Sequence, residues 1–310
     1  MTDILTISPN PQVDVATAVD RMNDTCKLRC SDARRDPGGG GINVARVIHR
    51  LGGDCLAVFL AGGATGQLLQ QLLEAEHVPA VCLGIAGDTR ENFSVSESST
   101  GRQFRFILPG PFVAKNEWER CIAYIQALPT PPRYLVMSGS LPSGVPADFY
   151  AILAREARAR GIRIIVDTSG PALVSVLEEG VTLVKPSLAE LRELTGLPLL
   201  HECEWRDAAC GIVERGQAEM VVLTLGPLGA LLVTRDVTLR AQALPALVSS
   251  AIGAGDSFVG AMVWALNRNT SVSEAFHYGL AAASATLVSK GTGLCRQPDV
   301  HRLYQQHFQA

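Results

Sequence analysis

The sequence lacks long apolar runs, a secretion signal and a strong excess of charge of one sign. No apolar run approaches the ~20 residues that a membrane-spanning helix needs, and residues 1–6 are not a basic segment followed by an apolar core. The net charge is −3 over 310 residues, and no run of Lys and Arg stands out. These absences argue against a membrane protein and against a nucleic-acid surface. They predict a cytoplasmic protein whose ligands are small molecules.

Clusters of metal-binding side chains are missing too. The eight cysteines include no Cys-x-x-Cys pair, and the six histidines are scattered along the chain. A metal ion held entirely by protein side chains is therefore not expected. The thiols are expected to be reduced and mostly buried. A strand predicted over residues 25–32 would place Cys26 and Cys30 on one face as small apolar residues.

Two common nucleotide-binding motifs are also absent. Asn43 stands where the dinucleotide pattern G-x-G-x-x-G needs its third glycine, and G-x-x-x-x-G-K-[ST] occurs nowhere in the chain. The chain is thus neither an obvious Rossmann dehydrogenase nor a Walker-type NTPase. The four glycines at residues 38–41 nevertheless lead into a predicted helix, and such a helix start describes a site for an anion or a sugar.

A second glycine motif lies near the end of the chain, at residues 253–256, directly before a helical run over 258–266. Gly253 and Gly255 let the backbone approach a ligand closely, and Asp256 falls in the first turn of the helix. Bare N–H groups beside a carboxylate suggest phosphoryl transfer, with an anion site next to a base. The alternative is a tight strand-to-helix turn with a carboxylate that favours the helix dipole.

Predicted strands and helices alternate over most of the chain. With 47% hydrophobic and 18% charged residues, the chain can bury a large core. The pattern predicts an α/β protein with a mainly parallel sheet covered on both faces. Strands are predicted at 4–8, 55–60, 80–83, 134–137, 162–167, 181–185 and 220–225, and helices at 42–51, 65–76, 147–159, 171–179, 188–195 and 204–215. Ligands should gather at the carboxyl ends of the strands, near Ser138, Asp167, Lys185 and Thr224.

One segment breaks this rhythm. Phe93 and Val95, then Phe104 and Phe106, alternate with polar residues around a Ser/Thr/Gly turn, which predicts an antiparallel hairpin with one apolar face. Two strands alone are marginal in water, so extended pieces between residues 13 and 33 should complete a small sheet. We expect this sheet to act as a lid over the ligand site. A second copy of the lid would cover its apolar face, which predicts a homodimer.

The two glycine motifs together, GGGGINVA at 38–45 and GAGDS at 253–257, resemble the PfkB or ribokinase-like sugar kinases over nearly the whole chain. Motifs at 27–30, 37–43, 61–66, 138–142 and 290–292 resemble the branch of that family that phosphorylates fructose 6-phosphate. The resemblance implies one three-layer α/β/α ribokinase-like domain over residues 1–310. It also implies a β-sheet lid built from about 12–36 and 89–108.

The resemblance further implies the roles of individual residues. Asp256 would be the general base that takes the proton from the first-carbon hydroxyl of fructose 6-phosphate, while Gly253 and the amides of Ala254 and Gly255 hold the transferring phosphoryl group. Sugar-binding positions would be Asp14, Gly39, Gly40, Asn43 and Ser138, with Lys27, Arg29 and Arg90 on the sugar phosphate. Alternatively, Arg29 and Arg90 lie on the solvated surface of the lid and bind no phosphate.

On the nucleotide side, the resemblance implies ATP, magnesium and potassium as cofactors. ATP would lie against Lys185, Ser187, Thr224, Gly226, Gly229 and Ser284. Glu190 would act on magnesium through water, or else serve only as a first-turn helix carboxylate. A potassium loop would form around Ser250, Ile252, Thr286, Ser289 and Gly291. Two positions depart from the family pattern: Ser187 replaces an Asn, and Ala251 replaces a common Thr.

Two alternative functions and one form of regulation stay open. The first is a sister kinase for tagatose 6-phosphate or fructose 1-phosphate. Sugar phosphates that differ at one hydroxyl are not distinguished by the sequence alone. A sugar-phosphate sensor that keeps the fold without turnover is compatible with Ser187 and Ala251. A second, inhibitory ATP near the lid, against Lys27 and Ala189, is implied by the resemblance alone.

Overall fold

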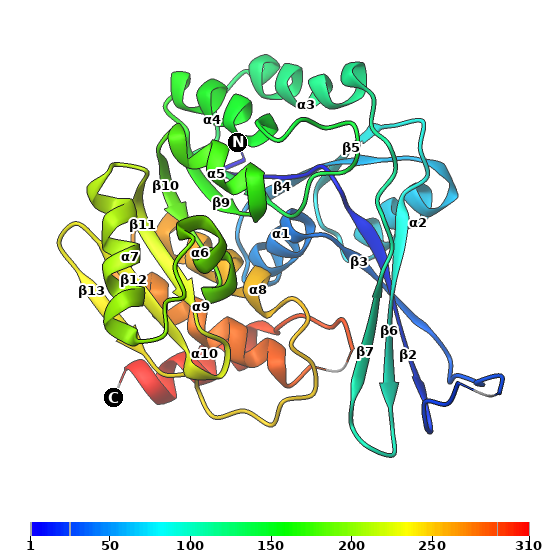
Figure 1. The fold of residues 1–310 in the computed structure, drawn as a ribbon. Coiled ribbons are helices and arrows are strands. Elements are labelled where there is room, and N and C mark those ends of the chain that lie inside the picture. The colour runs from blue at the N-terminus through cyan, green and yellow to red at the C-terminus, as the bar shows by residue number, and fades with distance from the viewer. Residues whose placement is uncertain (1, 25, 290, 310) are drawn as a thin grey trace.

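The main sheet of the protein lies at its centre and is mostly parallel (Figure 1). The computed structural model describes residues 2–24, 26–289 and 291–309. Within them the sheet runs in the order β13-β12-β11-β10-β9-β8-β1-β4-β5. Its strands are β1 (Ile4–Ser8), β4 (Cys55–Ala61), β5 (Ala80–Gly84), β8 (Tyr134–Ser138), β9 (Arg163–Asp167), β10 (Val181–Val184), β11 (Ala218–Thr224), β12 (Ala230–Thr234) and β13 (Thr238–Ala241). Among the described residues, the β11–β12 and β12–β13 pairings are the antiparallel ones in this sheet, and the others are parallel.

The strand order reverses between β1 and β8, which pair in parallel at the centre of the sheet. From β1 the chain builds outward through β4 and β5, and it then returns to the other side of β1 to add β8, β9, β10 and β11. Connections on the two sides leave toward opposite faces, so a crevice opens at the carboxyl ends of β1 and β8. The topology thus locates the expected ligand site before any side chain is considered.

Helices cover both faces of this sheet and create two hydrophobic cores. The helices are α1 (Gly40–Arg50), α2 (Gly63–Ala75), α3 (Lys115–Ala127), α4 (Phe149–Ala159), α5 (Gly170–Glu178), α6 (Leu188–Thr195), α7 (Glu202–Glu214), α8 (Ala254–Asn267), α9 (Val272–Leu287) and α10 (Gln297–Phe308). One core lies under α1, α2, α8, α9 and α10, and the other under α3 to α7. Alternate strand residues enter opposite cores, as Ile4 and Leu5 do.

A second, smaller sheet projects from the main body (Figure 1). It has the order β3-β2-β6-β7, formed by β2 (Gln12–Val19), β3 (Arg34–Gly38), β6 (Arg90–Glu97) and β7 (Gln103–Ile107). Phe93 lies opposite Phe106, and Val95 lies opposite Phe104, so the predicted hairpin with one apolar face is confirmed. The intervening Ser94 pairs with Arg105 on the other face.

The structure corrects two expectations about this region and the thiols. The described residues 26–32 form no strand and instead link β2 to β3, and Thr25 lies outside the described residues. Cys26, Cys30 and Cys203 are exposed, while only Cys55, Cys121 and Cys295 are fully buried. The strand prediction was wrong because the face formed by Cys26, Leu28 and Cys30 is not packed against other residues: both cysteines are exposed and Leu28 is only half-buried.

Several elements were not predicted from the sequence: helices α3, α9 and α10 and the antiparallel pair β12–β13. For α9 the capping box of Ser271 and Glu274 was a signal that was missed. Apart from the strand over 25–32, the predicted elements are present with shifts of a few residues at their ends. Among the described residues, no helix is both long enough and apolar enough to cross a bilayer.

The packing of α8 against α9 yields a test of the first core. The ring of Phe276 is fully buried and meets Phe258 edge-to-face at 5.8 Å between ring centroids. We expect Phe276→Ala to lower the free energy of unfolding by about 3–5 kcal/mol, because it removes a buried ring and leaves a cavity. Phe112→Ala is the matched control, since that ring is 66% exposed. Urea denaturation of both variants measures the difference, and equal losses would contradict this account of the core.

Candidate active site

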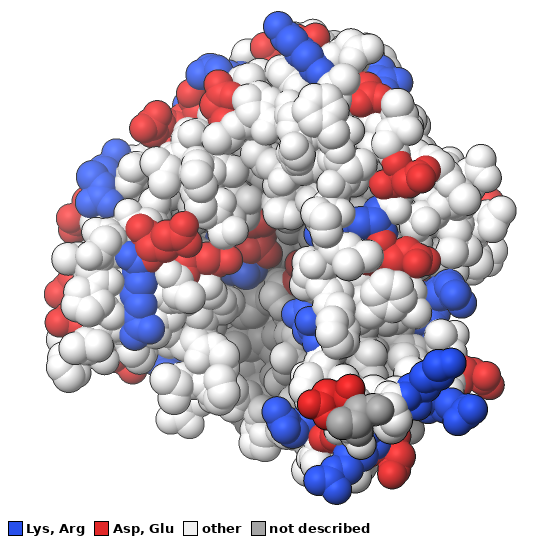
Figure 2. Space-filling model, turned by 45° about the vertical axis from the view of Figure 1, so that its right-hand side comes forward, with Lys and Arg blue, Asp and Glu red and all other residues white. Residues whose placement is uncertain are grey.

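A polar cavity of about 280 Å³ lies in the crevice where the strand order reverses. Figure 2 shows a hollow between the main body and the small sheet, with acidic and basic side chains along its walls. The residues of the predicted site that line the cavity are Asp14, Gly39, Gly40, Asn43, Ser138, Glu190, Ile252, Gly253 and Asp256. They come from β2, α1, β8, α6 and α8, segments far apart in the sequence.

The first glycine motif allows the start of α1 to lie against β8. Gly39 has a φ of +119°, a value that side chains disfavour. A Cβ on Gly40 would lie 2.3 Å from Oγ of Ser138 and 2.9 Å from the backbone N of Gly139. Only glycine permits this approach, and it leaves backbone exposed to the cavity beside the Ser138 hydroxyl.

The second glycine motif forms the amino-terminal turn of α8. Gly253 caps the helix in the left-handed conformation, with a φ of +75°. Ser257 donates its amide to the Gly253 carbonyl at 2.8 Å, whereas the amide of Ala254 has only a long contact of 3.4 Å to the Ala251 carbonyl. First-turn amides have no partner within the helix and carry its positive dipole end, so this turn can receive an anion.

Asp256 lies in that turn and is held by a single amide. Nδ2 of Asn43 donates to Oδ2 of Asp256 at 2.8 Å. Burial and the negative charge of Asp167 raise the pKa of Asp256 to about 6, although the Asn43 hydrogen bond and the Lys185 ammonium lower it. A carboxylate with such a pKa is still ionised at neutral pH and is a stronger proton acceptor than an ordinary aspartate.

Asp14 faces the same cavity from β2. It is 7% exposed, and burial raises its pKa to about 6 against the opposing effects of a hydrogen bond from Gln12 and the charge of Arg105. A Cβ on Gly38 would lie 2.1 Å from Oδ2 of Asp14, so the glycine motif also makes room for this carboxylate. Asp14 is thus placed to accept hydrogen bonds from the hydroxyls of a ligand.

A second, mainly apolar cavity of about 660 Å³ lies on the other side of the α8 turn. Ala251, Ala254 and Gly255 line it, while Gly253 and Asp256 line the first cavity. The predicted nucleotide positions that line the second cavity are Ser187, Thr224, Gly226, Gly229 and Ser284. The amino-terminal turn of α8 therefore separates a polar cavity from a mainly apolar one.

Lys185 is a buried cation close to the α8 turn. Its Nζ lies 3.0 Å from Oδ1 of Asp167, and it would lie 3.4 Å from a Cβ placed on Gly255. Burial acts to lower the pKa of Lys185, but the carboxylates of Asp167, Glu190 and Asp256 outweigh it and raise that pKa. The ammonium therefore stays charged next to the backbone of the turn.

Glu190, the residue predicted to act on magnesium, lies at the start of α6. Ser187 and Glu190 form a capping box at the start of α6, in which the Ser187 amide donates to Oε2 of Glu190 at 2.7 Å. Glu190 also lines the polar cavity, so it fits a carboxylate that acts on a cation through water. Among the described residues, no group of three His, Cys, Asp or Glu side chains is arranged to hold a metal ion.

The two segments of the predicted cation loop lie side by side. The amides of Ser249 and Ser250 both donate to the carbonyl of Leu287, at 2.7 and 3.2 Å. Ser250 and Thr286 are buried, and their hydroxyl and carbonyl oxygens are donors that suit a monovalent cation. Ser289 and Gly291 continue the second segment, and Lys290 between them lies outside the described residues.

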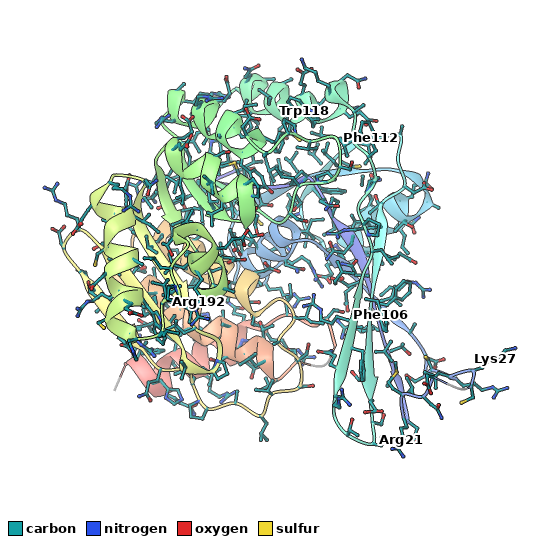
Figure 3. All side chains as sticks on the ribbon, in the orientation of Figure 1. Arg21, Lys27, Phe106, Phe112, Trp118 and Arg192 are labelled. Carbon is teal, nitrogen blue, oxygen red and sulfur yellow. The ribbon has the colours of Figure 1, made fainter. Side chains whose placement is uncertain are left out.

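Three predicted phosphate-binding residues do not line the polar cavity. Lys27 lies at the outer end of the small sheet, away from the main body (Figure 3), and Arg29 belongs to the same exposed segment. Arg90 donates to the carbonyls of Asn10 and Leu108, each at 3.1 Å, and so ties β6 to neighbouring loops.

Two other arginines are found at the site although the sequence did not single them out. Arg105 of β7 lines the polar cavity, and Arg46 of α1 is fully buried and donates to Oδ1 of Asn43 at 3.1 Å. The polar face of the predicted hairpin was a signal for Arg105. For Arg46 the helical pattern gave only a weak signal: position 46 lies one turn after the apolar Ile42, but a charged side chain usually reaches solvent.

Comparison with known proteins identifies the family. The model of the pfkB family of carbohydrate kinases matches residues 4–299. The chain belongs to this family of kinases. Its fold agrees with that of Arabidopsis thaliana ribokinase, at a TM-score of 0.75 over 98% of this chain and 99% of the other, with 19% identity. The expected ribokinase-like α/β fold with a second small sheet is therefore confirmed.

Two bacterial pfkB relatives share the name ATP-dependent 6-phosphofructokinase isozyme 2. The Mycobacterium tuberculosis protein is 44% identical over 97% of this chain and 89% of its own length. The Escherichia coli protein is 40% identical over 98% of both. Crystal structures of Escherichia coli phosphofructokinase-2 with potassium and with fructose-6-phosphate have TM-scores of 0.94 and 0.93 to this chain, at 40% and 39% identity over 99% of each chain. Another structure is of its tetrameric inhibited form, with a TM-score of 0.92, 39% identity and 99% of each chain covered.

The raised pKa of Asp256 predicts how its removal changes the stability of this pfkB protein with pH. Because the folded state raises that pKa from 3.8 to about 6, protonation favours folding, and this contribution is complete below about pH 4 and lost as pH rises through 6. Asp256→Asn should therefore be more stable than the wild type at pH 8 by about 1–3 kcal/mol, a gain of a few degrees in Tm. The gain should shrink between pH 7 and pH 4. Thermal unfolding of both proteins across that range measures it, and a gain independent of pH would contradict the burial of this charge.

Proposed function

We propose that this protein transfers the γ-phosphoryl group of ATP to the first-carbon hydroxyl of fructose 6-phosphate, giving fructose 1,6-bisphosphate and ADP. One observation carries the proposal: the amino-terminal turn of α8, with Asp256 in it, separates a polar cavity from an apolar one. A sugar phosphate fits the first and a nucleotide the second, so the phosphoryl group would cross at the turn. The names of the two bacterial relatives support the choice of substrate.

Asp256 would act as the general base of this reaction. As the hydroxyl oxygen forms its bond to phosphorus, the proton passes to the carboxylate, and the bond from phosphorus to the bridging oxygen of ADP breaks. The first-turn amides of α8, at Ala254 and Gly255, face the transferring group and stabilise its charge. Lys185, 3.0 Å from Asp167, keeps a positive charge near that path.

Two cations complete the proposed chemistry. Glu190 would hold magnesium through water, and the ion would supply charge neutralisation to the nucleotide phosphates when it is bound. Ser250, Ile252, Thr286, Ser289 and Gly291 would surround potassium. That loop continues directly into the α8 turn, because Gly253 follows Ile252 in the sequence. Within the loop, the Ile252 amide donates to Oγ of Ser250 at 3.3 Å.

The sugar would bind between α1 and the small sheet, which we propose acts as a lid formed by about 12–36 and 89–108. Asp14, Asn43, Ser138 and the backbone of Gly39 and Gly40 offer hydrogen bonds to hydroxyls. Arg105, also in this cavity, is the guanidinium of the same chain best placed for the sugar phosphate.

Lys27 and Arg29 would serve a neighbouring copy. Both lie in the segment that leads away from the main body, so a homodimer formed through the small sheets would bring them toward a partner's site. Phe106 is 47% exposed and Phe104 is half-buried on the apolar face that such a dimer would cover.

Activity of the wild type and of Asp256→Asn tests the proposal. We expect ADP release with ATP and magnesium to be stimulated by fructose 6-phosphate more than by tagatose 6-phosphate, fructose 1-phosphate or free fructose. Asp256→Asn should keep the fold and lose about 10²–10⁴-fold in kcat, because the amide cannot accept the proton. The kcat/KM of the wild type should fall as pH decreases through about 6, where Asp256 becomes protonated.

Each other outcome has a defined meaning. A preference for tagatose 6-phosphate or fructose 1-phosphate would assign the protein to a sister kinase. Binding of fructose 6-phosphate without ADP release from any sugar would make it a sensor. Near-full activity of Asp256→Asn would remove Asp256 from the role of base.

The proposed lid interface predicts an effect on assembly. Phe106→Asp should convert a dimer to monomers at micromolar concentration, because it buries a charge in an apolar interface. Phe112→Asp is the control, as Phe112 is 66% exposed but lies outside the four strands of the small sheet. Light scattering after size exclusion measures the mass. A monomeric wild type, or equal effects of both substitutions, would contradict an interface through this sheet.

A further inference from the structure

Among the residues that the structure describes, Arg46 is the largest fully buried side chain, and the proposed chemistry so far gives it no role. It lies in α1, three residues after Asn43, with 0% of its surface exposed. Its Nε donates to Oε2 of Glu76 at 2.9 Å, and its Nη1 donates to the Pro37 carbonyl at 2.8 Å. A buried guanidinium costs several kcal/mol unless it is paired and hydrogen-bonded, so its presence in the core calls for an explanation.

Both carboxylates that pair with Arg46 also have another cationic partner. The buried Asp36, whose Oδ1 lies 3.9 Å from Nη2 of Arg46, is paired with Arg34 at 2.7 Å. Glu76 lies at the end of α2 with a quarter of its side chain exposed, and Arg50, one turn further along α1, also pairs with it at 3.2 Å. Without Arg46, Glu76 would keep one cationic partner and access to water. The contact of Arg46 that reaches the site is the hydrogen bond from Nη1 to Oδ1 of Asn43 at 3.1 Å.

This contact fixes which way the Asn43 amide points. The amide has one accepting end and one donating end. Arg46 can only donate, so it requires the carbonyl oxygen of Asn43, and the NH2 group must then face Asp256. In the opposite orientation, the carbonyl would face the carboxylate and the NH2 would face the guanidinium, and both hydrogen bonds would be lost.

We propose that Arg46 is a positioning residue for phosphoryl transfer: held by Glu76 and the Pro37 carbonyl, it locks the Asn43 amide so that its NH2 group orients the Asp256 carboxylate toward the acceptor hydroxyl. The inference rests on the proposed function of Asp256 as the base. Because Pro37 belongs to β3, the same guanidinium also ties the small sheet to α1. Arg46 therefore connects the small sheet, the Asn43 amide and, through that amide, the Asp256 carboxylate.

The acid limb of the pH profile is the pH range in which kcat/KM falls as the base becomes protonated. Its position distinguishes a positioning role of Arg46 from a role in folding stability alone. The charged groups facing Asp256 are Asp167, Lys185 and Asp14. The charge of Arg46 lowers the pKa of Asp14, so the test substitution must keep that charge. The Asn43 hydrogen bond lowers the pKa of Asp256. If Arg46 no longer holds the amide, that bond weakens and the pKa rises, so the acid limb of kcat/KM moves to higher pH.

The experiment compares Arg46→Lys with Arg50→Lys in the full-length protein, using ATP, magnesium and fructose 6-phosphate. Lysine keeps the charge but lacks the fork that reaches both Glu76 and Asn43. For Arg46→Lys we expect the acid limb to rise by about 0.5–1 pH unit, the size of one lost hydrogen bond to a carboxylate, with a several-fold fall in kcat at pH 7. Arg50→Lys should leave the limb in place, because Arg50 bonds Glu76 and the carbonyls of residues 294 and 295 but not Asn43.

A double variant tests whether Arg46 acts through Asn43. In an Asn43→Ala background, Arg46→Lys should cause no further shift of the acid limb. An equal shift with or without Asn43, or no shift from Arg46→Lys, would overturn the inference. Should Arg46→Lys fail to fold, Glu76→Gln can replace it, because this substitution removes the carboxylate that holds the Arg46 guanidinium. Glu76→Gln should shift the acid limb in the same direction by a smaller amount, and no shift would contradict the inference. Failure of the proposed function is distinguishable, because it would appear as an active Asp256→Asn protein.

Discussion

The hydrogen bond from Asn43 to Asp256 joins the two glycine motifs, and the site depends on it. The two residues are 213 positions apart, and their side chains meet at 2.8 Å because α1 and α8 pack side by side on the same face of the sheet. Gly260 allows this approach, since a Cβ there would lie 2.9 Å from Val47 and 3.1 Å from the Val44 carbonyl. A larger residue in α8 would move Asp256 away from the amide that orients it.

The same arrangement concentrates negative charge where it is costly and useful. Asp14, Asp167, Glu190 and Asp256 all line one cavity. The buried Lys185 offsets the charges of Asp167 and Asp256, while Arg105 and Arg46 offset that of Asp14. Burial raises the pKa of Asp14 and of Asp256 to about 6, which makes both better proton acceptors than exposed carboxylates. The amides at the start of α8 then supply positive potential at the point between the two cavities. Such a site gives up folding stability in order to keep reactive groups desolvated.

Sequence reasoning found the residues whose type follows from backbone geometry, and it missed those whose role follows from packing. The glycines at 39, 40 and 253 were found because close approach and positive φ require them. Arg46 was missed because helical periodicity cannot reveal that a charged residue is buried by a neighbouring helix. Lys27 and Arg29 were expected on the sugar phosphate, yet their segment leads away from the cavity of its own chain, a direction that no local pattern encodes. The predicted strand over 25–32 failed for a related reason, since only contact with an apolar surface would have held it extended.

By itself, the sequence determined the α/β class, the order of most strands and helices, and the two glycine-rich helix starts, because strand and helix periods and the conformational freedom of glycine are local properties. Only the tertiary structure decided that the order of strands reverses between β1 and β8, that the α8 turn divides a polar cavity from an apolar one, and that Arg46 and Arg105 join the site. Those features arise where distant segments meet. Their energies come from burial, close packing and paired charges, which no window of the sequence contains.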